Sequence, residues 1–255
     1  MGEFIRTERD GHVFLITLDR PQVLNSLHAP ACHELSAVWD EFVADDDLWI
    51  AIVTGAGERA FCAGHDLRDG FYDPMPETGW AGMSRRSDLA KPIIAAVNGL
   101  ALGGGWEIAM AADIVVAAEH ARFGLPEPRV GFAALGGGAH RLPLRMPYHM
   151  AMGLLLTGRQ IDAAEAHRWG LVNSVVPADK LMDVARQWAE EMLQCSPLAL
   201  RYTKMAANAA NEPAALRQEV EPLEQALGAR LAEHADTREG LAAFAEKRKP
   251  LWTGR

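Results

Sequence analysis

The chain has 255 residues and a mass of 27.8 kDa, which suits one large domain or a domain with an appendage. Hydrophobic residues make up 49% of it and charged residues 23%, so it is globular and can bury a sizeable core. The net charge of −9, without any basic block, argues against a general nucleic-acid-binding protein. An anionic ligand would therefore need positive charge that is local to its site.

Membrane insertion, export and metal binding are not expected either. The longest apolar runs are too short and too interrupted by glycine to span a bilayer, and the N-terminus resembles neither a signal nor a transit peptide. Cys32, Cys62 and Cys195 are scattered, which suits a reducing compartment. The nine histidines show no pair with metal-ligand spacing. We predict a cytoplasmic protein with no membrane segment and no metal.

The first third of the chain alternates strand and helix patterns. The sequence predicts a strand over 12–21 that ends at Asp-Arg-Pro. A helix is expected over 28–47, where apolar residues recur at spacings of three and four. A buried strand over 48–57 then runs into a glycine turn, and a short extended piece follows over 59–67. Residues 69–90 are irregular, with prolines, glycines and aromatics, and are interpreted as a long loop or lid.

The alternation continues through the middle of the chain. The stretch 91–105 is interpreted as one apolar strand that leads into three glycines, and 106–114 as a helix. Residues 115–124 contain a strand, 136–146 break into a helix start, and 162–177 are typical of a helix, a glycine stop and a strand. The strands come in pairs followed by helices, so the class is α/β without the regular spacing of a doubly wound sheet.

The C-terminal part differs in composition. From about Asp179 the pattern is helical and charged, with breaks at Ser196-Pro197, Glu212-Pro213 and Glu221-Pro222. We therefore divide the chain into an α/β core over residues 1–195 and a helical region over residues 196–255.

The triple glycine Gly103–Gly105 stands directly before the helix predicted from Trp106. Glycines between a strand and a helix let the backbone approach a ligand, and the first helical turn offers unpaired N–H groups to an anion. Tight packing of helix on strand explains them as well. No Lys-Ser or Lys-Thr follows, and Glu107 stands where a dinucleotide fingerprint has its third glycine, so neither phosphate-loop motif is present.

Two glutamates are the sharper signal for chemistry. Glu107 lies within an apolar helical stretch, where burial would raise its pKa toward the range used for proton transfer. Glu127 lies between Pro126 and Pro128, which fix the direction of the chain on both sides. A helix-dipole role for Glu107 and a solvent-loop position for Glu127 are the alternatives. Together, two positioned glutamates and glycine turns indicate acid–base chemistry at a carbonyl.

The motifs around these residues resemble those of a known family. "RAFCAGHDL", "KPIIAAVNGLALGGGWEIAMAADIVVA" and "ARFGLPEPRVG", at these separations, are similar to the crotonase superfamily and its enoyl-CoA hydratase branch. The resemblance covers essentially the whole chain, and the segments 157–176 and 243–255 look like the carnitinyl-CoA dehydratase-type subgroup. It implies a crotonase-like spiral of ββα units with a C-terminal helical trimerisation region. It also implies a homo-trimer or a dimer of trimers.

The resemblance further implies how a CoA thioester is activated. The backbone N–H groups of His65 and Gly104 match the two donors of an oxyanion hole for the thioester carbonyl. Glu107 and Glu127 match the two hydratase glutamates, which hold one water between them. This implies reversible syn hydration of a 2-enoyl-CoA to a 3-hydroxyacyl-CoA, with Glu107 as base toward water and Glu127 as acid toward Cα. The roles are interchangeable in the reverse reaction.

The substrate contacts that the resemblance implies come from three parts of the chain. Coenzyme A belongs to the substrate, so no separate cofactor is expected. Arg68 matches a position near the phosphates, and Lys247 matches a basic residue from a neighbouring subunit, with Phe244 near the adenine. The residues expected to contact CoA or the acyl group are Val23, Leu24, Ala63, Asp66, Leu67, Arg68, Leu135, Phe244 and Lys247.

Two departures from the family pattern leave the substrate open. Leu135 stands where many hydratases have a glycine near the reacting carbons, and His65 is larger than the usual small residue. The imidazole of His65 either reaches the site or lies in a surface turn. The aromatic residues that could line the pocket, or surround a trimethylammonium group by cation–π attraction, are Phe71, Tyr72, Trp80, Trp106 and Phe132. Enoyl isomerisation, thioester hydrolysis and a non-catalytic binding role remain alternatives to hydration.

Overall fold

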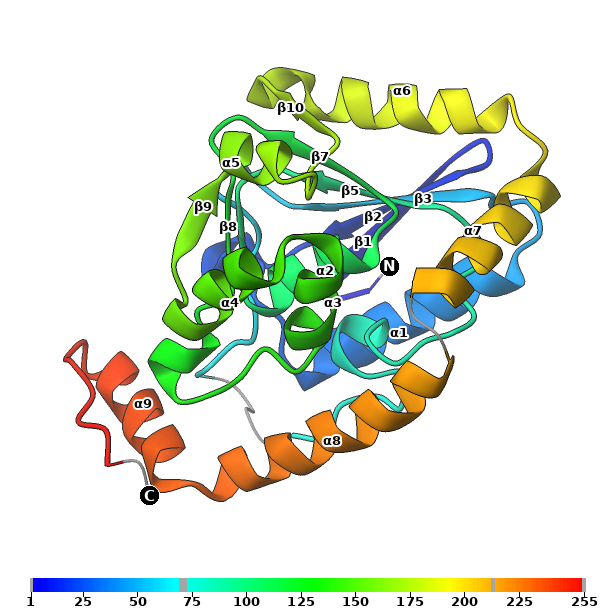
Figure 1. Cartoon of the computed structure of the whole chain (residues 1–255). Coiled ribbons are helices and arrows are strands. Elements are labelled where there is room, and N and C mark those ends of the chain that lie inside the picture. The colour runs from blue at the N-terminus through cyan, green and yellow to red at the C-terminus, as the bar shows by residue number, and fades with distance from the viewer. Residues whose placement is uncertain (1, 69–72, 212–213, 254–255) are drawn as a thin grey trace.

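Two β-sheets form the centre of the protein in a computed structural model that describes residues 2–68, 73–211 and 214–253 (Figure 1). The larger sheet has the order β1-β2-β3-β5-β7-β10 and the smaller one β4-β6-β8-β9. The strands of the larger sheet are β1 (Ile5–Asp10), β2 (Val13–Leu18), β3 (Ile50–Gly55), β5 (Ile93–Val97), β7 (Ile114–Ala118) and β10 (Ser174–Val176). Those of the smaller sheet are β4 (Ala60–Cys62), β6 (Leu100–Leu102), β8 (Arg122–Gly124) and β9 (Gln160–Asp162).

The chain winds as a spiral in which each turn adds one strand to each sheet. β3, β5 and β7 lie side by side in the larger sheet, and each is followed by β4, β6 or β8 in the smaller one. Neighbouring strands are parallel except at β1 and β9, which pair antiparallel at the sheet edges. Val53, Ala95 and Val115 are in register across three turns. The predicted spiral of ββα units is confirmed.

Helices cover both sheets and extend away from them at the C-terminal end (Figure 1). The first five are α1 (Ala29–Ala44), α2 (Gly104–Ala111), α3 (Gly138–Arg145), α4 (Tyr148–Thr157) and α5 (Ala163–Arg168). The others are α6 (Leu181–Leu193), α7 (Pro197–Asn211), α8 (Ala214–Glu233) and α9 (Ala235–Ala245). Short 3₁₀ helices are η1 (Pro21–Val23), η2 (Trp80–Gly82), η3 (Glu127–Val130) and η4 (Ala178–Lys180).

The central strands β3 and β5 of the larger sheet are buried on both faces, which explains their continuous apolar runs. On one face, Ile50 and Ile52 of β3 pack with Leu181, Ala185 and Ala189 of α6. The alternate β3 residues point to the main core, where aromatic side chains of α1 and the α2 helix pack between the sheets. Helix α2 is therefore buried on all sides, as its sequence indicated.

The stretch 91–105 differs from the prediction, because it forms two strands and not one. Asn98 donates its side-chain amide to the carbonyls of Gly55 (2.8 Å) and Gly57 (2.6 Å) and accepts from the Gly55 N–H (3.1 Å). A Cβ on Gly99 would lie 2.4 Å from the carbonyl oxygen of Arg59. The Asn-Gly pair thus turns the chain from the larger sheet into the smaller one. This turn brings the triple glycine to the end of β6.

The last three helices make a separate layer around the core. Helix α7 begins at Pro197, and Lys204 ties it to the core through Asp113 (2.7 Å) and the Lys91 carbonyl (2.9 Å). Helix α9 packs on η3, and Thr237 donates to the Gly131 carbonyl at 2.8 Å. These three helices lie within residues 197–245, and the division of the chain into a core over 1–195 and a helical region over 196–255 stays a prediction. None of the helices within the described ranges is both long and apolar enough to cross a bilayer.

Candidate active site

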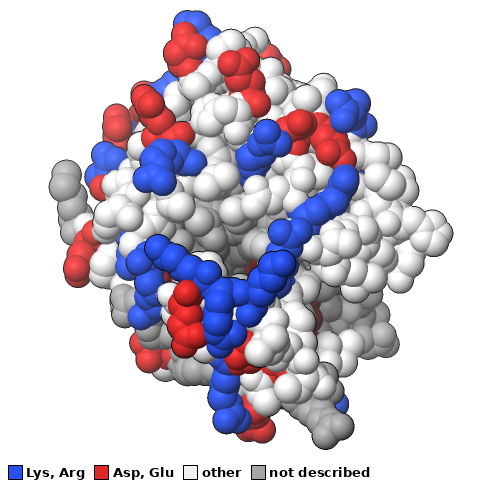
Figure 2. Space-filling model, turned by 90° about the vertical axis from the view of Figure 1, so that its left-hand side faces the viewer, with Lys and Arg blue, Asp and Glu red and all other residues white. Residues whose placement is uncertain are grey.

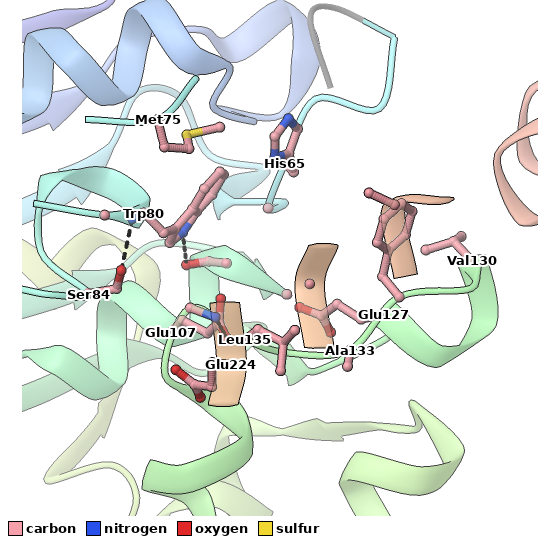
Figure 3. A pocket seen from close by; sticks show the side chains of 18 of the residues that line it. His65, Met75, Trp80, Ser84, Glu107, Glu127, Val130, Ala133, Leu135 and Glu224 are labelled. Atoms are coloured by element: carbon pink, nitrogen blue, oxygen red, sulfur yellow. Dashed lines mark hydrogen bonds between the residues drawn. The ribbon is translucent and has the colours of Figure 1, made fainter. Parts of the chain in front are cut away.

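A cavity of about 500 Å³ lies between the core and helix α8. Its walls come from the loop after β4, from η2, from the first residues of α2, from η3 and the segment after it, and from α8 (Figure 3). Glu107 and Glu127, which lie 20 residues apart in the sequence, both line it (Figure 3). The cavity therefore joins the two acids that the sequence singled out.

The triple glycine forms a close-packed turn at the N-terminus of α2. Gly103 has a φ of +54°, and a Cβ there would lie 2.9 Å from Glu127 Oε1. A Cβ on Gly105 would lie only 1.9 Å from the carbonyl oxygen of Cys62 in β4. Tight packing of helix on strand is thus confirmed as one reason for these glycines. Because α2 packs so closely on β4, the first backbone N–H groups of this helix lie at the cavity wall.

The loop that carries His65 lies against this glycine turn. Leu27 donates its N–H to the Gly64 carbonyl (2.9 Å) and accepts from the Asp66 N–H (2.8 Å). Successive residues of an extended segment direct their backbone groups to opposite edges, so the His65 amide faces away from Leu27. A Cβ on Gly64 would lie 3.4 Å from the Gly104 nitrogen. The two predicted oxyanion donors, His65 and Gly104, are therefore neighbours at the cavity.

Trp80 contacts both of these residues. Its indole N–H donates to the Gly104 carbonyl at 3.0 Å, and its ring stacks on the His65 imidazole with centroids 5.3 Å apart (Figure 3). A Cβ on Gly104 would lie 2.3 Å from the Trp80 ring, so only glycine leaves room for this contact. The interpretation of His65 as a surface-turn residue is wrong. Its ring lines the cavity, and burial lowers its pKa to about 4.

Glu107 is anchored by the backbone that faces it. Its Oε1 accepts hydrogen bonds from the N–H groups of Gly136 (2.9 Å) and Gly138 (2.8 Å). Burial raises its pKa to about 7, with a further contribution from the negative charge of Glu224, although the two N–H donors favour the ionised form. The predicted buried carboxylate is therefore present, and its direction is fixed by the chain that follows η3.

Glu127 starts η3 between Pro126 and Pro128 and lies beside Gly103. Burial raises its pKa to about 8, and the charge of Glu107 adds to this shift. Its Oε2 is buried and has no hydrogen-bond partner among the described residues. A buried acceptor without a partner is costly when ionised, so this group favours the protonated state.

Helix α8 supplies a wall that the sequence did not reveal. Glu224, Gly228 and Ala232 follow one another at a spacing of four and line the cavity, together with Gln225 and Ala229. Glu224 accepts a hydrogen bond at 3.0 Å from Nδ1 of His140 in α3, with that nitrogen protonated. The small residues at this spacing were the available signal. Nothing in the sequence showed that this face of α8 turns toward Glu107.

The residues expected to contact CoA fall into three groups. Ala63, Leu67 and Leu135 line the cavity. Val23 and Leu24 lie beside them, because the Ala63 N–H donates to the Leu24 carbonyl at 3.0 Å. The remaining predicted residues are not among those that line the cavity.

Three of those remaining side chains are exposed and one is buried. Asp66 is buried and forms an ion pair with Arg20 at 3.2 Å, so its carboxylate is turned toward the core. Arg68 is exposed, and its backbone N–H donates a hydrogen bond to Asp66 Oδ1 at 3.2 Å. Phe244, in the last turn of α9, and Lys247, just after it, are exposed. Contacts of these four residues with CoA stay predictions.

The aromatic residues divide in a similar way. Trp80 and Phe132 line the cavity, whereas Trp106 is buried in the core, where its ring lies 5.9 Å from that of Phe123. Phe71 and Tyr72 lie outside the described residues. Met75 adds an apolar side chain that sequence reasoning missed (Figure 3). In the described ranges, no group of three or more His, Cys, Asp or Glu residues is placed to hold a metal ion.

Comparison with known proteins agrees with this geometry. The family model described as enoyl-CoA hydratase/isomerase matches residues 8–255. Carnitinyl-CoA dehydratases of Proteus mirabilis and Citrobacter koseri are each 40% identical to the chain, with all of both chains covered. The crystal structure of carnitinyl-CoA hydratase from Mycobacterium avium superposes with a TM-score of 0.92 at 38% identity, and that of enoyl-CoA hydratase from Mycobacterium tuberculosis with 0.78 at 36%, again over both full chains. The chain therefore belongs to the enoyl-CoA hydratase/isomerase family, the crotonase superfamily that its glycine and glutamate motifs resemble.

Proposed function

We propose that the protein catalyses the reversible addition of water to a 2-enoyl-CoA thioester, giving a 3-hydroxyacyl-CoA. One observation supports this above all: the buried Glu107 and the half-buried Glu127, whose Oε2 is shielded from solvent, line a single cavity beside the Gly104 turn. An isomerisation or a thioester hydrolysis does not require both acids. The glutamate pair therefore favours hydration or dehydration over those alternatives.

The thioester carbonyl is placed at the backbone N–H groups of His65 and Gly104. As water adds to Cβ, negative charge moves onto the carbonyl oxygen and the enolate forms. Donors that are already fixed in place stabilise this charge, and one such donor contributes about 2.7–4 kcal/mol. Trp80, which holds the Gly104 carbonyl at 3.0 Å, fixes the orientation of that peptide.

The different surroundings of the two acids support a division of roles. Glu107 receives two backbone N–H bonds, which favour its ionised form, so it takes a proton from water while the oxygen bonds to Cβ. Glu127, whose pKa burial raises to about 8, holds a proton near neutral pH and gives it to Cα. The water supplies the hydroxyl group and restores one proton to the pair, so the reaction is balanced.

Coenzyme A is part of the substrate, and no further cofactor is required. Lys and Arg side chains border a hollow on one face of the molecule, although acidic side chains are mixed among them (Figure 2). This supports phosphate binding by local charge on a protein whose net charge is −9. Because similar proteins are named carnitinyl-CoA dehydratase or hydratase, a carnitinyl-type acyl group is the second candidate substrate.

Assembly into trimers or a dimer of trimers is part of the proposal, as is a cytoplasmic location. Leu198, Tyr202 and Met205 follow one another at spacings of four and three on α7 and are all more than half exposed. An apolar stripe of this kind is typical of a surface that another protein chain covers.

The test follows the loss of enoyl-thioester absorbance with crotonyl-CoA. We expect Glu107→Gln and Glu127→Gln each to lower kcat by about 10²–10⁴, the usual contribution of a positioned acid or base. Glu119→Gln, which changes an exposed glutamate between them, serves as the control, and circular dichroism checks the fold. If either cavity variant keeps at least half of the wild-type activity, hydration by this pair is wrong. A 3-enoyl product would instead identify an isomerase.

A further inference from the structure

Glu224 is a third carboxylate in the cavity that the proposed reaction does not use. Its side chain is only 14% exposed, and it comes from α8, outside the α/β core. Figure 3 places it next to Glu107, and its charge contributes to the raised pKa of that residue. A carboxylate that disfavours ionisation of the proposed base needs a reason to be there.

The charges around Glu224 leave the inner end of the cavity acidic. Among the described lining residues, Arg85 and His65 are those with basic side chains. Arg85 is exposed, and burial lowers the pKa of His65 to about 4, so its ring is neutral. Arg141 is buried beside Gly137 and favours ionised Glu107, but it is not one of the lining residues.

His140 holds Glu224 at this place. The 3.0 Å bond between its Nδ1 and Glu224 Oε1 links α3 to α8, and the imidazole is only 16% exposed. A carboxylate oriented by a buried partner loses little side-chain entropy when a ligand approaches it. The pair is therefore built to present negative charge at a fixed position.

The remainder of this wall leaves room for a bulky acyl substituent. Apart from Gln225, the other α8 residues of this wall are Gly228, Ala229 and Ala232, which carry no side chain larger than a methyl group. Trp80 and Phe132 also line the cavity, and aromatic rings attract cations through their electron-rich faces.

We propose that Glu224, oriented by His140, selects acyl groups that carry a cationic substituent beyond the reacting carbons, such as a quaternary ammonium group. This inference rests on the proposed function for the placement of the thioester. A cationic substituent gives the half-buried carboxylate an opposite charge in a medium less polar than water. A neutral acyl chain offers no opposite charge, so the bond from His140 alone offsets the desolvation of that carboxylate.

Binding of two unreactive thioesters tests the inference without relying on catalysis. Butanoyl-CoA and 4-trimethylammoniobutanoyl-CoA differ in the cationic group and are titrated into the full-length protein by calorimetry. We expect Glu224→Gln to weaken binding of the cationic thioester about tenfold and that of butanoyl-CoA less than about twofold. Glu233→Gln removes an exposed charge from the same helix and is expected to change neither affinity.

Two results would overturn the inference. Equal weakening of both thioesters in Glu224→Gln means that the residue contributes to thioester binding in general and does not distinguish the cationic group. Unchanged affinity for both means that its charge is not sensed. His140→Ala removes the orienting partner but not the charge, so we expect it to reduce the preference only in part.

Kinetics with the matching 2-enoyl thioesters separate this inference from the proposed function. If wild type hydrates neither thioester, the proposed reaction is wrong, while the binding titrations still decide whether Glu224 selects cations. If wild type hydrates both and Glu224→Gln leaves their ratio of kcat/KM unchanged, the reaction stands and the inference is wrong.

Discussion

The cavity has two walls that are built in different ways. On the core side, Gly103–Gly105 pack against β4 and Glu127, and backbone N–H groups hold Glu107. On the α8 side, side chains carry the contacts, such as the bond from His140 to Glu224. Backbone geometry fixes the groups proposed to do chemistry, whereas side chains on a helix form the surface proposed to select the acyl group. We therefore expect changes of size on the α8 wall to disturb the core wall little, whereas the charge of Glu224 acts on Glu107.

The largest expected effect comes from a methyl group added to the core wall. In Gly105→Ala the new Cβ would lie 1.9 Å from the Cys62 carbonyl oxygen, which is a backbone atom of β4 and cannot turn aside as a flexible side chain would. We expect the free energy of unfolding to fall by about 3 kcal/mol, at the upper end of the range for overpacked sites. Urea unfolding measures this, together with crotonyl-CoA hydration, which should be lost.

Gly153→Ala in α4 is the matched control, because nothing lies within 4 Å of its new Cβ. It should leave hydration unchanged and stabilise the fold slightly, since alanine is the better helix former. A Gly105→Ala variant as stable as wild type would show that the core wall is not rigid.

Trp80→Phe should have an intermediate effect, since it removes the indole N–H bond to the Gly104 carbonyl but keeps an aromatic ring. We expect kcat to fall about threefold to tenfold with little change in KM, the loss expected for one hydrogen bond. Trp49→Phe is a matched control. Its indole donates to the Asp46 carbonyl at 3.1 Å and stacks on His12, away from the cavity. An unchanged kcat in Trp80→Phe would contradict its role in orienting that peptide.

The pH dependence of hydration should report the two core-wall acids. Glu107 must lose its proton to act as base, so kcat/KM should rise with pH toward about 7. Glu127 must keep its proton to act as acid, so kcat/KM should fall above about 8. The product is a narrow bell-shaped profile. His65→Asn should leave both limbs in place, because burial lowers the pKa of that ring to about 4. Flat rates between pH 5 and 9 would contradict the assignment.

The core wall was largely predictable from the sequence, and the α8 wall was not. Apolar runs located the strands. The isolated charge of Glu107 within a further apolar stretch marked the buried helix. The proline-flanked Glu127 is fixed by its immediate neighbours, so it too was visible locally. The break at Asn98 was missed because its cause lies in contacts with Gly55 and Gly57, more than 40 residues away.

Glu224 could not be recognised in the same way. It follows Glu219 and Glu221 in a charged helical stretch, and periodicity alone does not say which face of such a helix turns inward. Its importance depends on the path of α8 across the cavity and on His140, 84 residues earlier. Trp80 was among the aromatic residues expected to line the pocket, but its contacts with Gly104 and His65 could not be predicted, because it lies in an irregular loop.

The smallest expected effect comes from the same Gly-to-Ala change on the α8 wall. In Gly228→Ala the new Cβ lies 3.7 Å from Leu135 Cδ1, an ordinary contact distance, and helix α8 gains a better helix former. We expect the free energy of unfolding to rise by about 0.5–1 kcal/mol, as in Gly153→Ala. Crotonyl-CoA hydration should stay within about twofold of wild type, while kcat/KM for longer or branched acyl groups should fall, because the methyl group narrows the cavity beside Leu135. A loss of crotonyl-CoA hydration as large as in Gly105→Ala would show that both walls are equally rigid, and that acyl selection cannot be changed apart from the chemistry.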